Sequence, residues 1–329
     1  MVAVRFATFV LTFATLFRAV AAQEVVMSDG EVIAGSVVSV DGSRAKVRAT
    51  DGAMRVVGVD RIDCEHLADG TTKRHAAQLV KGPLDAPMQA LLTKLQKGDA
   101  VPEEQLMPLV AKCTQEAVDV LGAAAQDKNH KARLVAARIL AMTATKEGMR
   151  AAIDAAKADT GGALWKALSS VTSAGASIAA IDAAGARADV EAQMTSKDKN
   201  VRFGCAWVAA KLGSKEALPV LATFVGDPDH HVRESAATCL GECGDASGAK
   251  LLITMCSRER SPEMEANKGA DAETRALVAR FVARERIHSC ELLGKLQCKE
   301  AVPTLTALGK HKDPVLAAAA KKALEAIGG

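Results

Sequence analysis

The sequence predicts a mainly α-helical protein, an α-solenoid of stacked helical hairpins preceded by a small β module. Two observations support this prediction. A helical pattern that opens at Asp198 returns 31 residues later at Asp229, and a repeat period of this size is typical of solenoids. Near the N-terminus, short β-prone runs are separated by three Asp-Gly pairs, which favour tight hairpins.

Residues 1–22 have the pattern of a secretory signal peptide. One early positive charge, Arg5, precedes an apolar run from Phe6 to Phe17, and small residues follow before Gln23. The apolar run is too short to span a bilayer comfortably and Arg18 follows it directly, so we expect cleavage rather than an uncleaved anchor. The protein is then exported, to a periplasm or to the extracellular space, with no membrane-spanning segment in the mature chain.

Charge and composition exclude some classes of partner. The full chain has a formal net charge of +3, and loss of Arg5 and Arg18 with the signal peptide leaves +1. Tyrosine is absent and aromatic residues make up 3% of the chain. With neither a basic surface field nor platforms for base stacking, we expect no nucleic-acid partner. In a core so poor in aromatic residues, Trp165 and Trp207 are expected to be packing anchors.

Eight cysteines occur without a C-x-x-C pair or a compact spacing. We therefore expect most of them to be small buried side chains rather than disulfide partners. Cys239 and Cys243 stand four residues apart on a predicted helix, beyond the usual reach of a disulfide. The best long-range candidate pair is Cys243 with Cys298, because the two hold nearly equivalent places in successive units.

Residues 23–66 are predicted to form a small β domain of about four strands. The order of its elements resembles the SH3-like and Sm-like small barrels, which implies a β-meander or a partly closed barrel. The aromatic and basic residues with which such barrels bind RNA or peptides are missing, so a structural cap or docking module is expected. The predicted strands are Glu24 to Met27, Val32 to Val40, Ala45 to Ala49 and Met54 to Val59.

Residues 67–126 are predicted to be a helical transition or a degenerate repeat that caps the array. Apolar residues in steps of three and four predict helices at Pro87 to Gln96 and Pro102 to Ala125. Terminal repeats are usually atypical, because one of their faces must meet water.

The regular array occupies residues 127–329 and begins near Asn129. Arg133 precedes Arg202 by 69 residues, and the segment that begins at Lys146 precedes its counterpart at Lys215 by the same distance. Equal offsets at both helices of the hairpin indicate one register. The interval between these units has room for one diverged hairpin, with helices predicted at Ala163 to Val171 and Ile178 to Met194.

An insertion near residues 257–279 interrupts the register. Gly294 follows Gly241 by 53 residues, 22 more than one period, and the segment from Lys299 restates the one from Lys215 almost letter for letter. The extra residues include a charged loop. Asp271 is then expected to cap a long helix from Ala272 through Leu296, and a last helix to follow Asp313.

The unit pattern resembles HEAT repeats, in particular the short HEAT-like repeats also found in phycobilin lyases. The shared features are the D-x-x-V-R opening, the A-A-x-x-L-G continuation from Ala236 and the E-A-[LV]-P-x-L second helix. The resemblance covers Asn129 to the C-terminus and implies a right-handed α-solenoid. It further implies a structural ladder, broken where Asn129 replaces the acid and where the acid before Arg286 is displaced. The ladder residues are Asp198, Arg202, Asp229 and Arg233, of which the two acids are expected to act first as N-caps.

Two clusters suggest chemistry, but a structural role is favoured for each. His230 and His231 adjoin a helix start beside Asp229, yet no further ligand pattern accompanies them, so they are expected to be solvated. His288 and Cys290 stand two apart on a predicted helix and should diverge, which disfavours a Cys-His nucleophile. The sequence therefore predicts no catalytic, cofactor or metal site.

The favoured function is an exported, non-enzymatic scaffold that binds another protein through its solenoid surface. An enzyme or enzyme accessory of the phycobilin-lyase kind is an alternative that the shared repeat implies and the export signal opposes. A structural component of the cell envelope is a second alternative. In the family the second helices usually line the concave face, which implies exposed partner contacts at Lys215, Glu216, Lys250 and Lys299.

Overall fold

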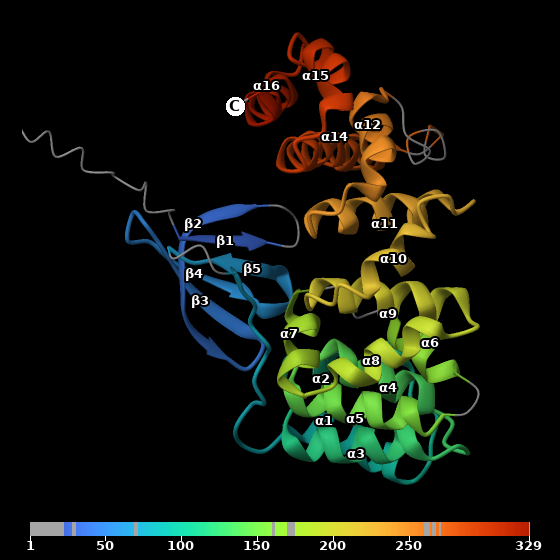
Figure 1. Ribbon diagram of the computed structural model, residues 1–329. Helices are drawn as coiled ribbons and strands as arrows, with labels where there is room; N and C mark the ends of the chain where they lie inside the picture. Colours follow the sequence, from blue (N-terminus) through green and yellow to red (C-terminus); the bar gives the residue numbers. More distant parts are fainter. Residues whose placement is uncertain are drawn as a thin grey trace, which may run out of the picture.

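The computed structural model is a stack of helices with a β module beside it (Figure 1). It describes residues 23–27, 31–68, 72–159, 162–169, 175–259, 264, 268–269 and 271–328. The predicted signal peptide and most of the predicted charged loop lie outside these residues. Among the helices that the structure describes, none is both long and apolar enough to cross a bilayer.

The β module is a six-stranded antiparallel sheet with the order β4-β3-β2-β1-β5-β6. The four predicted strands are confirmed, but the sheet has two more and continues past His66, where the prediction ended it. The additional strands were missed because β5 follows β4 after only a 3-10 turn and β6 is two residues long. The strands are β1 (Glu24–Met27), β2 (Val32–Asp41), β3 (Arg44–Ala49), β4 (Met54–Gly58), β5 (Ile62–His66) and β6 (Thr72–Lys73).

β2 is an inner strand of the sheet and pairs with both β1 and β3. A shift in register between Val37 and Ser39 bends this strand. Gly35 allows β3 to approach closely, since a Cβ there would lie 2.1 Å from the Arg48 carbonyl oxygen. The 3-10 turn η1 (Val59–Arg61) then returns the chain so that β5 pairs with β1. β1 to β4 therefore form the predicted meander, β5 and β6 extend it on the other side of β1, and β4 and β6 are the edges of the sheet.

Helical hairpins form the rest of the chain, and Asp198, Asp229 and Asp271 cap the helices that follow them, as predicted. The long helix after the insertion is confirmed as α14. The helices are α1 (Ala86–Gln96), α2 (Glu103–Ala111), α3 (Gln115–Gln126), α4 (Arg133–Met142), α5 (Lys146–Lys157), α6 (Ala163–Ser169), α7 (Gly175–Ala183), α8 (Arg187–Ala192), η2 (Gln193–Thr195), α9 (Lys199–Lys211), α10 (Ala217–Ala222), α11 (His230–Glu242), η3 (Ala246–Gly248), α12 (Ala249–Ser257), α14 (Ala272–Lys295), η4 (Lys299–Ala301), α15 (Val302–Leu308) and α16 (Pro314–Gly328).

Two predicted helices are each divided in the structure. The run Pro102 to Ala125 is divided into α2 and α3, because the Thr114 hydroxyl accepts a hydrogen bond from Ala117 N at 3.3 Å and starts a new helix. The run Ile178 to Met194 is divided into α7, α8 and η2, because Gly185 has a φ of +63° and cannot continue α7. In both places an apolar stripe persists across the break, which is why periodicity alone predicts one helix.

Four hairpins share one left-handed residue after their first helix. Ala144, Gly213, Gly244 and Gln297 have φ values of +50°, +87°, +81° and +50°, respectively. These positions are separated by the offsets of 69, 31 and 53 residues that the sequence predicts. The backbone therefore repeats in the predicted register, even where the residue is not glycine.

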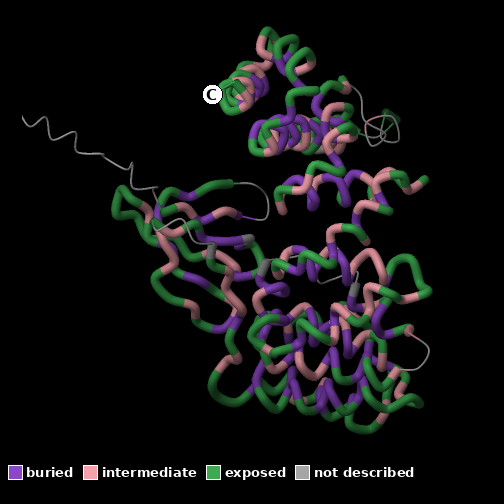
Figure 2. Tube along the Cα trace, viewed as in Figure 1, coloured by how far each residue is buried: buried purple, intermediate pink, exposed green. Residues whose placement is uncertain are grey.

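The β module shares a buried core with the early hairpins. Figure 2 colours the buried segments of both parts purple. Ala144 and Ala176 from the helical part are buried among the apolar side chains of the sheet. The backbone N–H of Ala77 donates to the Ala144 carbonyl at 2.9 Å. Glu65, only 3% exposed, pairs with His75 at 2.8 Å and so ties β5 to the linker. The module is therefore held in place on one side of the stack.

Candidate functional site

A groove of about 590 Å³ lies between the β module and the later helices. Its β wall comes from β1, β5 and Arg74, the residue after β6, and its helical wall from α9, α11, α14 and α16. Figure 1 shows the module beside the ends of α11 and α14, across the space that the groove occupies. Clefts of this volume are typical of ligand and peptide sites.

Glu242, in the last turn of α11, is the centre of the helical wall. Its carboxylate is 2.5 Å from Lys211 Nζ on α9 and 3.1 Å from His288 Nε2 on α14. Its carbonyl oxygen accepts a hydrogen bond of 2.5 Å from Lys295 Nζ. His288 also lies 3.5 Å from Glu291 on its own helix. Three helices are thus joined by one network of charged side chains.

The network sets the charge of its members. Burial raises the pKa of Glu242, but the hydrogen bond from His288 and the positive charge of Lys211 outweigh burial and hold the pKa at about 2. The hydrogen bonds to Glu242 and Glu291 raise the pKa of His288 to about 9. At neutral pH the carboxylate is therefore ionised and the imidazole is protonated.

Arg74 and Lys322 add two positive charges to the groove and take no part in the contacts around Glu242. The Nε atom of Arg74 is buried and has no hydrogen-bond partner among the described residues. Lys322 is exposed on α16 and lines the same groove. With protonated His288, the groove has five positive groups against two carboxylates, in a chain that is close to neutral. The positive groups are Arg74, Lys211, His288, Lys295 and Lys322.

The groove was missed in the sequence, although one pattern could have indicated its helical wall. Lys211, Glu242 and Lys295 occupy the same repeat position, since they are separated by the offsets of 31 and 53 residues. Alternating charge at one repeat position predicts contacts between neighbouring helices. Arg74 and Lys322 have no such pattern, because the β module and α16 meet the site only through the tertiary fold.

The cysteines are all free thiols, and seven of the eight are buried. The expectation that most are small buried side chains is confirmed, whereas the candidate disulfide between Cys243 and Cys298 is wrong. Cys243 Sγ lies 3.6 Å from the Ala210 carbonyl oxygen, and Cys298 Sγ lies 3.4 Å from Glu300. Cys243 lies against the preceding unit, whereas Cys298 contacts a residue of its own unit. At the offset of 53 residues the equivalent of Cys243 is Leu296, so the two cysteines do not hold the same repeat position.

The ladder arginines contact backbone rather than acids. Arg202 donates to the Ser196 carbonyl at 2.6 Å and Arg233 to the Asp227 carbonyl at 3.1 Å. The equivalent Arg133 and Arg286 make the same kind of bond even though their units lack the acid, at 3.1 Å to Ala125 and 3.0 Å to Cys256, respectively. Each arginine thus satisfies a carbonyl at the end of the preceding hairpin, which couples neighbouring units.

The other residues of interest do not converge on a chemical site. His288 lines the groove, whereas Cys290 is fully buried, so the two diverge as expected. His230 and His231 lie in the first turn of α11 with ring centroids 3.9 Å apart. The predicted contacts Lys215, Glu216, Lys250 and Lys299 are all exposed but lie outside the groove lining. No group of three metal-ligating side chains occurs among the described residues.

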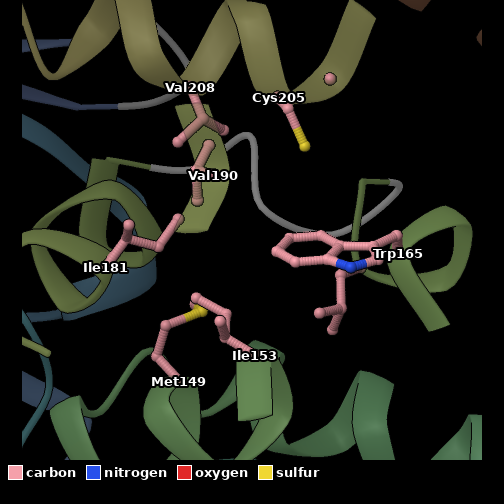
Figure 3. Close-up of a pocket in the computed structure, with 9 residues that line it drawn as sticks. Met149, Ile153, Trp165, Ile181, Val190, Cys205 and Val208 are labelled. Carbon is pink, nitrogen blue, oxygen red and sulfur yellow. The ribbon is translucent and has the colours of Figure 1, made fainter. Parts of the chain in front are cut away.

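Trp165 is a packing anchor, as predicted. It is 6% exposed and borders a small hollow of about 20 Å³ with Ile153, Ile181 and Cys205 (Figure 3). A hollow of this size holds at most about one water, and its apolar lining provides no hydrogen-bond partners. It is therefore a packing gap rather than a ligand site. Trp207 is half-buried, with Lys211 Nζ 5.3 Å from its ring centroid.

Comparison with known proteins agrees with the repeated geometry. Residues 187–267 match the family model of HEAT repeats. The chain contains HEAT-like repeats. A comparison with curated proteins finds no match to this HEAT-like protein.

Solved structures give distant similarities to this HEAT-like protein. The complex of CpcE and CpcF of phycocyanin lyase from Nostoc sp. PCC7120 is 16% identical, covering 75% of this chain and 96% of that one, with a TM-score of 0.38. A designed armadillo repeat protein in complex with the peptide (KR)4 is 18% identical, covering 73% and 92%, with a TM-score of 0.33. An engineered protein is 19% identical, covering 75% and 76%, with a TM-score of 0.39.

Proposed function

We propose that this HEAT-like protein is an exported, non-enzymatic scaffold that holds a segment of another protein in the groove between its β module and its later helices. The observation that supports this function is the groove itself, which is built from two separate parts of the chain. Its volume suits a short extended segment, and its lining mixes apolar side chains with charged ones.

The walls of the groove are fixed before any partner arrives. The Glu242 network joins α9, α11 and α14 on one side. On the other side, the shared core and the Ala77–Ala144 hydrogen bond hold the β module against the early hairpins. A preformed site binds at a lower cost in conformational entropy than a site that must be ordered on binding. This rigidity favours a role in binding.

A photo-crosslinking residue in place of Ala326, which lines the groove, tests the proposal. The full chain is produced in its native cells, irradiated, and examined for a discrete adduct with a second protein. The matched control is the same residue in place of Ala318, exposed on the same helix but outside the groove. We expect an adduct at Ala326 and none at Ala318. Absence of an adduct at Ala326, or equal adducts at both positions, would exclude the groove as the binding site.

The exposed lysines Lys215, Lys250 and Lys299, which the sequence indicates as partner contacts, lie outside the groove and can be tested separately from it. Charge reversal of Lys215, Lys250 and Lys299 together should change the captured proteins if that face also contacts a partner. An adduct at Ala326 that survives the triple variant would assign binding to the groove alone.

Export is tested by the N-terminus of the protein recovered from cells. Cleavage after Ala22 predicts a mature chain that begins at Gln23 and is found outside the cytoplasm. An intact Met1 in a cytoplasmic fraction would contradict the proposed location.

A further inference from the structure

We infer that the segment held in the groove is acidic, and that Arg74 and Lys322 are the two cations that receive its carboxylates. This inference rests on the proposed function and names the chemistry of the partner. Two features of the groove support it: cations that the groove leaves unpaired, and one buried donor that lacks a partner.

The charge excess is local. Glu242 pairs with Lys211 and His288, Glu291 pairs with His288, and the Lys295 ammonium donates to the Glu242 carbonyl oxygen. Arg74 and Lys322 then remain as the lining cations that have neither an ion pair nor a side-chain hydrogen bond among the described residues. Because they belong to opposite walls, a segment lying in the groove passes between them.

The environment of Arg74 favours an acidic partner in particular. Its Nε is buried without a hydrogen-bond partner among the described residues, and a buried unsatisfied donor lowers stability. A guanidinium presents its N–H groups in a planar fork that matches a carboxylate. An acidic side chain in the groove would pair with this guanidinium, which has no partner of its own among the described residues. A basic or purely apolar segment would leave it unpaired.

A short fluorescein-labelled peptide of alternating glutamate and alanine, blocked at both ends, is the probe. Blocking removes the terminal carboxylate, so binding reports acidic side chains alone. We expect the full chain to bind it, more weakly as salt is raised, and not to bind the matched lysine–alanine peptide. Inorganic phosphate in excess should compete poorly, because it offers a single anion to cations on two walls.

Each groove cation has a neighbour in sequence that serves as its control. Arg74→Ala and Lys322→Ala should each weaken peptide binding about tenfold, which corresponds to the loss of one charge-assisted contact. Lys73→Ala and Lys321→Ala remove exposed cations that do not line the groove, and should leave binding unchanged. Equal losses in the control variants would show a diffuse charge effect and overturn the inference.

Arg74→Met separates binding from folding. Since it removes an orphan donor, it should leave the melting temperature of the free protein unchanged or raise it, while peptide binding is lost. A lowered melting temperature with binding retained would assign Arg74 a structural role and overturn the inference.

Separate results would contradict the binding of a protein segment in the groove and the acidic character of that segment. If Ala326 gives a protein adduct but the acidic peptide does not bind, the groove is a binding site of another chemistry and this inference is wrong. If Ala326 gives no adduct, the proposed function itself is wrong.

Discussion

Gln297 and Gly244 occupy the same left-handed turn position, 53 residues apart, with φ values of +50° and +81°. A left-handed conformation costs an L-residue about 1 to 2 kcal/mol, whereas glycine adopts it freely. Gln297 is exposed, so its side chain contributes little in return. The last hairpin is therefore strained at a position where two of its predecessors have glycine.

Replacing Gln297 with glycine should stabilise the protein. We expect Gln297→Gly to raise the free energy of unfolding by about 0.5 to 1 kcal/mol, after the larger unfolded-state entropy of glycine is subtracted. Thermal unfolding measures the change. Gly244→Ala, at the equivalent position, is the control and should destabilise by about 1 kcal/mol. A lower melting temperature for Gln297→Gly would show that the turn is not the source of strain.

The contact between Glu242 and His288 predicts a pH dependence of stability. The pKa of His288 is raised from 6.5 to about 9, so its contribution is complete below pH 6.5 and lost as the pH rises through 9. The pKa of Glu242 is lowered from 4.5 to about 2, so its contribution is present above pH 4.5 and lost as the pH falls toward 2. The pair therefore contributes most between pH 4.5 and 6.5.

His288→Ala should remove that contribution. The loss is about 1 kcal/mol or less between pH 4.5 and 6.5, because 44% of the His288 side chain is exposed and solvent screens the pair. Above pH 9 the variant and the natural protein should unfold at nearly the same denaturant concentration. An equal difference at pH 6 and above pH 9 would contradict an electrostatic origin.

Cys243 should be the first thiol to be alkylated. A hydrogen bond from the Cys239 thiol, together with the charge of Lys211, outweighs burial and lowers the pKa of Cys243 to about 7. Cys243 is also the one partly exposed cysteine, since the other seven are buried. Iodoacetamide at neutral pH followed by peptide mass spectrometry should find it modified before the other seven.

A variant tests the cause of this reactivity. Lys211→Met should slow the alkylation of Cys243, because loss of the positive charge raises the thiol pKa. Lys250→Met removes an exposed lysine elsewhere and should not change the rate. Faster labelling of another cysteine in the natural protein would be inconsistent with the predicted order.

Glu234 and Arg258 form a partly buried ion pair that should contribute strongly to stability. The two oxygens of Glu234 lie 2.5 and 2.9 Å from the Arg258 guanidinium, and the side chains are 6% and 15% exposed, respectively. Removing one member of a buried pair costs about 3 to 5 kcal/mol. We expect Glu234→Ala to lie near 3 kcal/mol, because Glu285 remains 3.5 Å from Arg258.

Denaturant unfolding measures this loss. Arg55→Ala, which breaks an exposed pair with Glu31, is the matched control and should cost about 1 kcal/mol or less. The double variant Glu234→Ala, Arg258→Met should recover part of the loss, because the buried charge of Arg258 is removed together with that of Glu234. If the double variant were as unstable as the sum of its parts, the pair would not be coupled.

The helical register could be predicted from the sequence because it depends on local interactions. Asp198, Asp229 and Asp271 cap the helices that follow them, and an acceptor side chain before a helix needs only the next few backbone N–H groups. The strands around the Asp-Gly turns were also predictable, since hairpin turns depend on two or three residues. Periodicity was less informative at Thr114 and Gly185, where an apolar stripe continues across a break in the helix.

Only the tertiary structure decided the candidate site. By itself, the sequence determined the repeat length, the helix caps and the place of the insertion, all of which follow from neighbours along the chain. Arg74 and Lys322 line the same groove because the β module packs on Ala144 and Ala176, far from both residues in sequence. Such contacts depend on how whole units pack, and packing distributes its energy over many weak apolar contacts that no short motif encodes.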